Sequence, residues 1–130
     1  MFSGFSKSDI VGGSFCDCFA YLVGRHTAKL KGLFDRSFLP GFAFEYEGDN
    51  PSPLQLLKGK TSRVIITMDA PSDYAEEQAA PAITQLDLFT LQFCGFEKAQ
   101  VNLFGSIILA NDENKLLWEK LVQDIGSRGE

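Results

Sequence analysis

The fold is decided by residues 28–44, which have the sequence AKLKGLFDRSFLPGFAF. Thr27 stands just before this run, and its hydroxyl can accept a hydrogen bond from an unpaired amide at a helix start. Apolar residues then recur at helical spacing, at Leu30, Leu33, Phe34 and Phe38. Pro40 and Gly41 end the pattern. The stretch therefore predicts an amphipathic helix with one face on a core, followed by a loop over residues 41–60 that carries several aromatic rings.

On either side of this helix, strand-like and helical segments alternate. Residues 14–23 and 63–67 are apolar enough for buried strands, and residues 101–104 predict a third strand that continues, with a kink at Gly105, to Leu109. Further helices are expected over residues 81–93 and 111–126. This alternation predicts an α/β fold with parallel strands and right-handed crossovers. Residues 1–13 are expected to form an irregular lead-in and residues 14–130 one domain.

The two later helices have defined ends and faces in the sequence. Pro81 suits the first turn of one helix, and Gly95 suits its close. Its expected apolar face consists of Ile83, Leu86, Phe89 and Phe93, widened by Leu88 and Leu91. Asn111 or Asp112 can cap the last helix, and Gly126 is expected to end it. Its apolar side is expected at Leu117, Leu121 and Ile125, flanked by Trp118 and Val122.

Composition excludes several classes of protein. The net charge is −5 and the basic residues are scattered, which argues against a nucleic-acid partner. The three cysteines are an odd number without framework spacing, so Cys16 and Cys18 are interpreted as buried thiols in a strand. The lone His26 leaves too few ligands for a metal site. No signal peptide or transmembrane run of about 18 apolar residues is seen, and a cytoplasmic location is expected.

In open α/β sheets, ligands bind beyond the carboxyl ends of the strands. Three segments are therefore candidates for a binding site. They are residues 21–27, residues 67–74 and the region after Phe104.

Residues 29–44, 59–69 and 91–96 resemble the C-terminal part of the flavodoxin-like NAD(P)H:quinone oxidoreductases. The resemblance extends over residues 27–126 and implies a partial flavodoxin-like, three-layer α/β/α fold. Its short parallel sheet would hold the equivalents of strands 3, 4 and 5 of that fold. The resemblance also implies hydride transfer from NAD(P)H through FMN (or FAD) to a quinone, carried out by a homodimer.

The resemblance assigns roles to particular residues. Backbone amides in a loop can stabilise charge that develops on a reduced flavin, as an oxyanion hole does. Flavin contacts are implied for Gly24, Thr67, Met68, Asp69 and Ala70. Quinone-binding aromatic walls that reach across the dimer are implied for Phe44 and Tyr46. Tyr74 falls near a family tyrosine that hydrogen-bonds the flavin or substrate, and it is the catalytic candidate.

Two departures from the family pattern leave alternatives open. Residues 20–23 are Ala-Tyr-Leu-Val where the family usually carries Pro-Leu-Trp-Trp. The only Gly/Ser-rich candidate for an FMN phosphate loop, residues 11–14, precedes a strand and not a helix. One alternative is a truncated, non-catalytic remnant or an interaction subunit that pairs its sheet edge with another chain. Another is an unrelated small α/β binding domain.

The individual candidates also have plainer interpretations. Residues 67–70 could form a simple strand-to-loop turn, and Tyr74 could be an exposed loop residue. Phe44 and Tyr46 could pack within their own chain.

Overall fold

The computed structural model describes the backbone of residues 14–20 and, in full, most of residues 27–129. Three parallel strands form the central sheet in the order β1-β4-β5. They are β1 (Ser14–Ala20), β4 (Thr61–Thr67) and β5 (Gln100–Phe104). β4 lies in the middle, where its run of β-branched residues is buried on both faces of the sheet. The predicted parallel sheet is confirmed.

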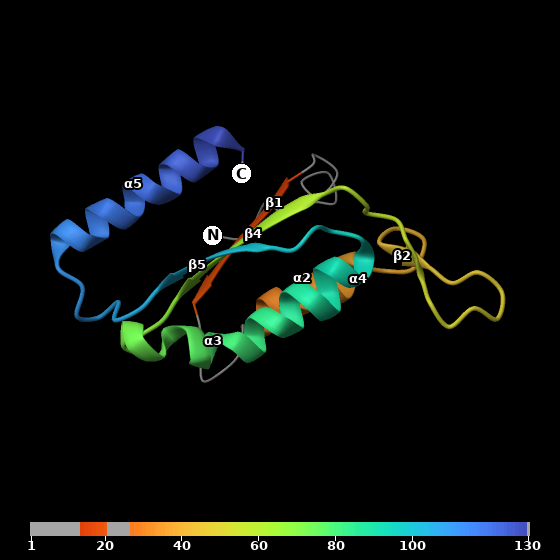
Figure 1. Cartoon of the computed structure of the whole chain (residues 1–130), viewed down its shortest axis with the longest axis horizontal. Coiled ribbons are helices and arrows are strands. Elements are labelled where there is room, and N and C mark those ends of the chain that lie inside the picture. The colour runs from red at the N-terminus through yellow and green to blue at the C-terminus, as the bar shows by residue number, and fades with distance from the viewer. Residues whose placement is uncertain (1–13, 21–26, 130) are drawn as a thin grey trace.

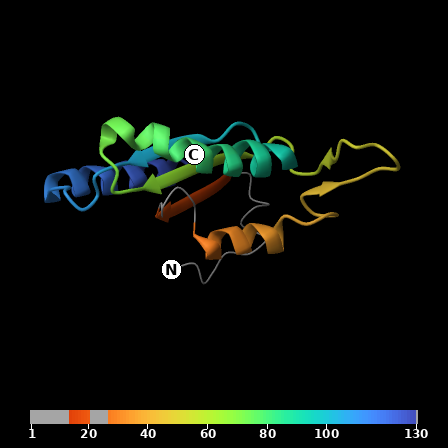
Figure 2. The same ribbon diagram turned by 90° about the horizontal axis from the view of Figure 1, so that it is seen from below.

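Helices cover both faces of this sheet, as Figures 1 and 2 show. Helices α2 (Ala28–Ser37) and α3 (Ser72–Leu86) lie on one face, and α5 (Asp112–Arg128) lies on the other. The predicted three-layer, flavodoxin-like α/β arrangement is thereby confirmed. Residues 1–13, Gly24 and His26 lie outside the described residues, as do the side chains of Cys16 and Cys18.

Helix α2 forms as its sequence predicts. The Thr27 hydroxyl accepts a hydrogen bond from the amide of Leu30, 3.4 Å away, and caps the helix. Leu30 and Phe34 are buried, and the helix ends at Ser37, shortly before Pro40. The loop expected after it also contains a short antiparallel hairpin, formed by β2 (Phe44–Glu45) and β3 (Leu54–Gln55).

The predicted start of the next helix at Pro81 is wrong, because α3 begins at Ser72. The early turns are built on alanines: Ala75, Ala79 and Ala82 are buried at helical spacing. Small side chains let the helix approach the sheet closely, but they leave only a weak hydrophobic pattern in the sequence. Pro81 is therefore inside the helix, with its ring exposed.

The predicted apolar face of this helix is also partly wrong. After Leu86 the chain makes a five-residue π-helical turn, η1 (Asp87–Leu91), before the short helix α4 (Gln92–Cys94). Leu86 and Leu91 are both buried, whereas Phe89, which we expected in the core, is 68% exposed. A π-turn adds one residue to the helical repeat, so it shifts the side chains that follow Asp87 relative to the core and leaves Phe89 outside it. Gly95 closes the helix at φ +110° as predicted.

Two predictions near the C-terminus need correction. The third strand ends at Phe104 and does not continue to Leu109, because Ser106 adopts a left-handed φ of +51° and residues 107–109 form a turn. Asn111 caps α5 as expected, with its side chain accepting from the amide of Asn114 at 2.8 Å. The helix passes through Gly126 and ends at Gly129, whose φ is +68°.

The main hydrophobic core lies on one face of the sheet. Val64, Ile66 and Met68 point toward α2 and α3, where they meet Leu30 and Phe34. Successive side chains of a strand point to opposite faces, so the other alternating side chains of β4 face α5. That face is held by Trp118, whose ring lies 5.2 Å from that of Phe104, and by buried Ile125. Leu117 and Leu121, expected on the apolar side of α5, are 60% and 39% exposed.

Candidate functional site

The carboxyl ends of β4 and β5 form the edge where a ligand site is expected. Thr67 and Phe104 pair directly across the two strands, so the loops that follow them start side by side. Both loops lie at one end of the sheet, beside the start of α3 (Figure 1). Topology thus brings two of the three predicted segments together, while residues 21–26 lie outside the described part of the chain.

Four hydrogen bonds clamp these two loops to each other. The amide of Met68 donates to the Phe104 carbonyl at 2.9 Å, and the amide of Ile107 donates to the Met68 carbonyl at 3.2 Å. The Ser106 amide donates to the Ala70 carbonyl at 2.9 Å. The Ile108 amide donates to the Asp69 carboxylate at 3.0 Å. The loop after β4 is therefore held from both its backbone and its side chain.

This clamp determines which groups of residues 67–70 are available to a ligand. The Met68 side chain is buried, 3% exposed, and its amide is already paired. Within the described residues, no acceptor is found for the amides of Asp69 and Ala70. The loop thus offers two backbone donors at a fixed position. The Asp69 carboxylate has a positioning role here, through the bond from Ile108.

Tyr74 lies on the first turn of α3 and not on the predicted loop, and it is 59% exposed. Its amide donates to the Pro71 carbonyl at 2.9 Å, as expected within a helical first turn. The ring is thus on the element that begins directly after the clamped loop.

Phe44 and Tyr46 lie elsewhere. Their rings are 5.8 Å apart, and the ring of Phe44 also packs 5.2 Å from that of Phe93 on α4. Figures 1 and 2 both show the β2 hairpin at the end of the molecule away from the start of α3. Within one chain, these aromatics do not line the same site as residues 67–70.

A hollow that the sequence did not predict lies beside the clamped loops. It has a volume of about 510 Å³ and lies between α5 and the sheet. Its apolar lining comes from Ile65, Phe104, Ile107, Trp118 and Val122. The spacing of Trp118 and Val122, one helical turn apart, was the available signal, but the strand face opposite them could not be assigned before the sheet register was known.

Three further features bear on possible function in the described residues: the Cys94 thiol, metal-ligating side chains and the hydrophobicity of the helices. Burial raises the pKa of the Cys94 thiol from 9.0 to about 11, so it is not a reactive thiolate at neutral pH. In residues 27–129, His, Cys, Asp and Glu do not gather in groups of three or more that could hold a metal ion. None of the described helices is long and apolar enough to span a membrane.

The family of the chain follows from comparison with known proteins. A family model described as the flavodoxin-like fold matches residues 23–125, so the chain belongs to that family. No curated protein matches by sequence. The predicted family resemblance is therefore confirmed at the level of the flavodoxin-like fold.

Solved structures agree on the fold. The chain is similar to the Smu.1420 protein of Streptococcus mutans UA159, with a TM-score of 0.74, 23% identity, and coverage of 90% of this chain and 62% of that one. It is similar to an FMN-dependent NADH-azoreductase from Bacillus anthracis in complex with FMN (TM-score 0.71, 15% identity, 95% and 62% coverage). It is also similar to an NAD(P)H:quinone oxidoreductase from Methanothermobacter marburgensis, with a TM-score of 0.63, 16% identity, and coverage of 88% of this chain and 55% of that one.

These likenesses show the fold and not the activity, since all three identities are below 25%. The chain spans between 55% and 62% of the length of these three structures.

Proposed function

We propose that this chain contributes the flavin-ring side of an FMN-dependent NAD(P)H:quinone oxidoreductase. The observation that carries the proposal is the clamped loop of residues 67–70 at the carboxyl edge of a flavodoxin-like sheet. Its two amides without an acceptor among the described residues suit the carbonyl-bearing edge of an isoalloxazine ring. A bound flavin would supply the hydride chemistry, and the protein supplies position and electrostatics.

Each candidate residue has a physical role in this proposal. The amides of Asp69 and Ala70 donate to the ring edge, and the Asp69 carboxylate keeps the loop in place through Ile108. Rigid donors need no reorganisation when negative charge develops on the ring, which is why their position matters more than their number. Thr67, half-buried at the strand end, adds a hydroxyl next to this edge.

The remaining roles depend on neighbours of the loop. Tyr74, exposed on the first turn of α3, is proposed to hydrogen-bond the flavin or the substrate. Gly24 is proposed as a further flavin contact. Phe44 and Tyr46 lie at the end of the molecule that is away from the clamped loop. Their proposed role as quinone walls therefore requires a second copy that brings them to this loop.

The test is a titration of the purified full chain with FMN, followed by flavin fluorescence and visible absorption. Because the residues proposed here contact the ring and not the phosphate, riboflavin should bind within about threefold of FMN, a difference of less than 1 kcal/mol. Saturable quenching with a shifted flavin band supports the proposal, and turnover of NADPH with a quinone is then measured. A chain that is folded by circular dichroism and quenches neither flavin contradicts it.

A further inference from the structure

The helix α5 covers the sheet without closing on it. Among its 17 residues, all of which the structure describes, Ile125 alone is buried. The hollow between this helix and the sheet has a volume of about 510 Å³, with Trp118 and Val122 on the side of the helix. Small-molecule sites typically have volumes of about 300–1,000 Å³. The hollow is therefore large enough for a ligand of ordinary size.

Two aromatic rings form one wall of the hollow. The ring centroids of Phe104 and Trp118 are 5.2 Å apart, and the two ring planes are inclined by 33°. Phe104 is buried at the end of β5, whereas Trp118 is half-buried. Flat rings pack on aromatic faces with a gain beyond that of their buried area. This wall favours an aromatic ligand over an aliphatic one.

The floor of the hollow is formed by rigid parts of the chain. Ile65 and Phe104 belong to the paired strands β4 and β5. Ile107, which also lines the hollow, is held by the bond from its amide to the Met68 carbonyl at 3.2 Å. A ligand that enters a preformed site pays little for ordering the protein.

The charged side chains that line the hollow do not select an ion. Lys115 and Glu119 lie one turn apart on α5 and have opposite charges. The Lys115 ammonium also lies 3.9 Å from the Asp112 carboxylate. An anion would meet these carboxylates and a chain of net charge −5, and any ion would lose water against an apolar floor. The charges therefore favour an uncharged ligand.

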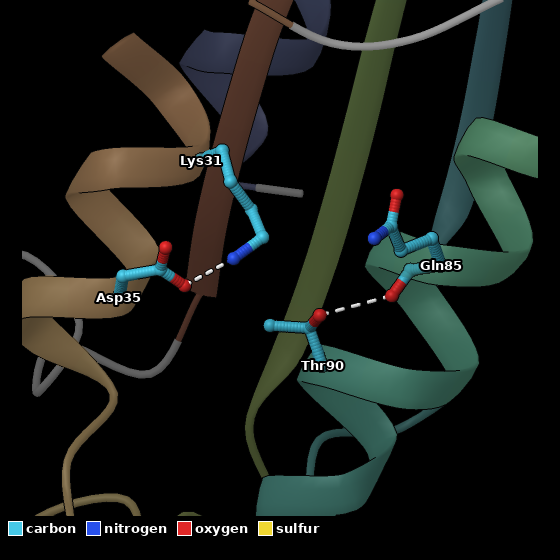
Figure 3. A network of polar contacts seen from close by, with 4 residues as sticks. All are labelled: Lys31, Asp35, Gln85 and Thr90. Carbon is cyan, nitrogen blue, oxygen red and sulfur yellow. Dashed lines mark hydrogen bonds and ion pairs between the residues drawn. The ribbon is translucent and has the colours of Figure 1, made fainter. Parts of the chain in front are cut away.

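The face of the sheet that carries α2 and α3 has a different hollow. This aromatic hollow of about 430 Å³ opens between α2 and the π-turn, with Phe89 at its margin. Figure 3 shows its polar groups bonded within the chain: Lys31 forms an ion pair with Asp35, and the Thr90 hydroxyl donates to the Gln85 carbonyl at 2.9 Å. A ligand that reached these groups would have to break both contacts, so the hollow under α5 is the stronger candidate.

We propose that the hollow between α5 and the sheet binds a small, flat, uncharged aromatic molecule that packs against Trp118. The amides of Asp69 and Ala70 do not line this hollow, so the proposal does not depend on the proposed function. A ligand there would fill the space under α5 and bind the folded chain only. Binding should therefore raise the temperature of thermal unfolding.

The test is a titration of the full chain, without flavin, with N-phenyl-1-naphthylamine, an uncharged aromatic probe that fluoresces in apolar sites. Trp118 is the only tryptophan of the chain, so energy transfer from it to the probe reports binding nearby. One probe should bind per chain, with a dissociation constant on the order of 10 µM. The compound 8-anilino-1-naphthalenesulfonate has the same ring system with an added sulfonate, and it should bind at least about tenfold more weakly.

Two variants at adjacent positions locate the site. Val122 lines the hollow and is 37% exposed, and Leu121, which does not line it, is 39% exposed. Val122→Phe places a ring in the hollow and should weaken probe binding at least about tenfold. Leu121→Phe is the matched control and should change it less than about twofold. Circular dichroism of each variant verifies that the fold is intact.

Four results would overturn the proposal. One is a folded wild-type chain that binds no probe at concentrations on the order of 100 µM. Another is tighter binding of the sulfonate than of the uncharged probe. The third is equal probe affinity of the Val122→Phe and Leu121→Phe variants. The fourth is displacement of the probe by saturating FMN, which would make the hollow part of the flavin site. A chain that binds the probe but no flavin supports this proposal and contradicts the proposed function.

Discussion

Replacing Asp87 with alanine should destabilise the protein by about 3 kcal/mol. The Asp87 carboxylate is 6% exposed and accepts two hydrogen bonds, from the Ala99 amide at 2.9 Å and from Gln92 at 3.0 Å. Ala99 is itself buried, 7% exposed, so its amide would lose its acceptor without gaining water. An unsatisfied buried donor costs about 1–3 kcal/mol, and a lost bond to a charged group costs about 1.5 kcal/mol more.

The assay is urea unfolding, followed by far-ultraviolet circular dichroism at a protein concentration low enough to keep every variant monomeric. Asp87→Asn keeps an oxygen for the Ala99 amide, and Gln92 can turn its own amide to accept from the new side chain. Its expected loss is therefore below about 1 kcal/mol. Glu119→Ala removes an exposed carboxylate on α5 and should change stability by less than about 0.5 kcal/mol.

The reasoning is refuted if Asp87→Ala lies within about 0.5 kcal/mol of the wild type, or if Asp87→Asn loses as much as Asp87→Ala. Either result would mean that the two hydrogen bonds do not hold the π-turn. The outward position of Phe89 would then have no structural anchor.

The other predictions concern the helix end, the buried thiol and the clamped loop. Gly95→Ala should lower the free energy of unfolding, measured in urea, by about 2–4 kcal/mol, because φ is +110° there and a Cβ would lie 2.9 Å from a backbone nitrogen. Gly32→Ala is the control: its Cβ meets nothing within 4 Å, so it should stabilise the protein by up to about 1 kcal/mol. Cys94, with its pKa raised from 9.0 to about 11 by burial, should react with iodoacetamide at pH 8 far more slowly in the native than in the urea-unfolded chain, as followed by mass spectrometry. Its contribution to stability should be fully present below pH 9 and be lost as the pH rises toward 11, because the unfolded thiol ionises first; a Cys94→Ala variant should lack this component of the pH dependence. Asp69→Ala removes the acceptor, 3.0 Å from the Ile108 amide, that holds the loop, and it should weaken FMN binding about tenfold in the fluorescence titration. Asp69→Asn keeps an oxygen at this position and should retain most of the affinity. Equal affinities for wild type and Asp69→Ala would contradict the positioning role.

The fold was predictable where short-range chemistry decides it. Thr27 and Asn111 cap their helices because each side chain reaches an amide three residues along the chain. The β-branched run of β4 predicts a central strand because both of its faces must be apolar. These contacts involve neighbours in the sequence, so a local pattern is enough to identify them.

The errors have physical causes of a different kind. The start of α3 was missed because Ala75 and Ala79 pack well against the sheet while adding little hydrophobicity to the sequence pattern. Phe89 was assigned to the core because regular helical spacing places it there. The π-turn that moves it outward is stabilised by Asp87 and the Ala99 amide, twelve residues apart, and no helical repeat contains that contact.

The sequence by itself determined the order of strands and helices, their parallel pairing and the edge of the sheet where a ligand would bind. Periodicity, caps and chain connectivity are sufficient for these features. Only the tertiary structure decided which groups meet. It joined the loops after β4 and β5 by hydrogen bonds, separated Phe44 from residues 67–70, and set Phe89 beside an aromatic hollow. Such contacts depend on the register and packing of residues far apart in the chain, which a local pattern does not specify.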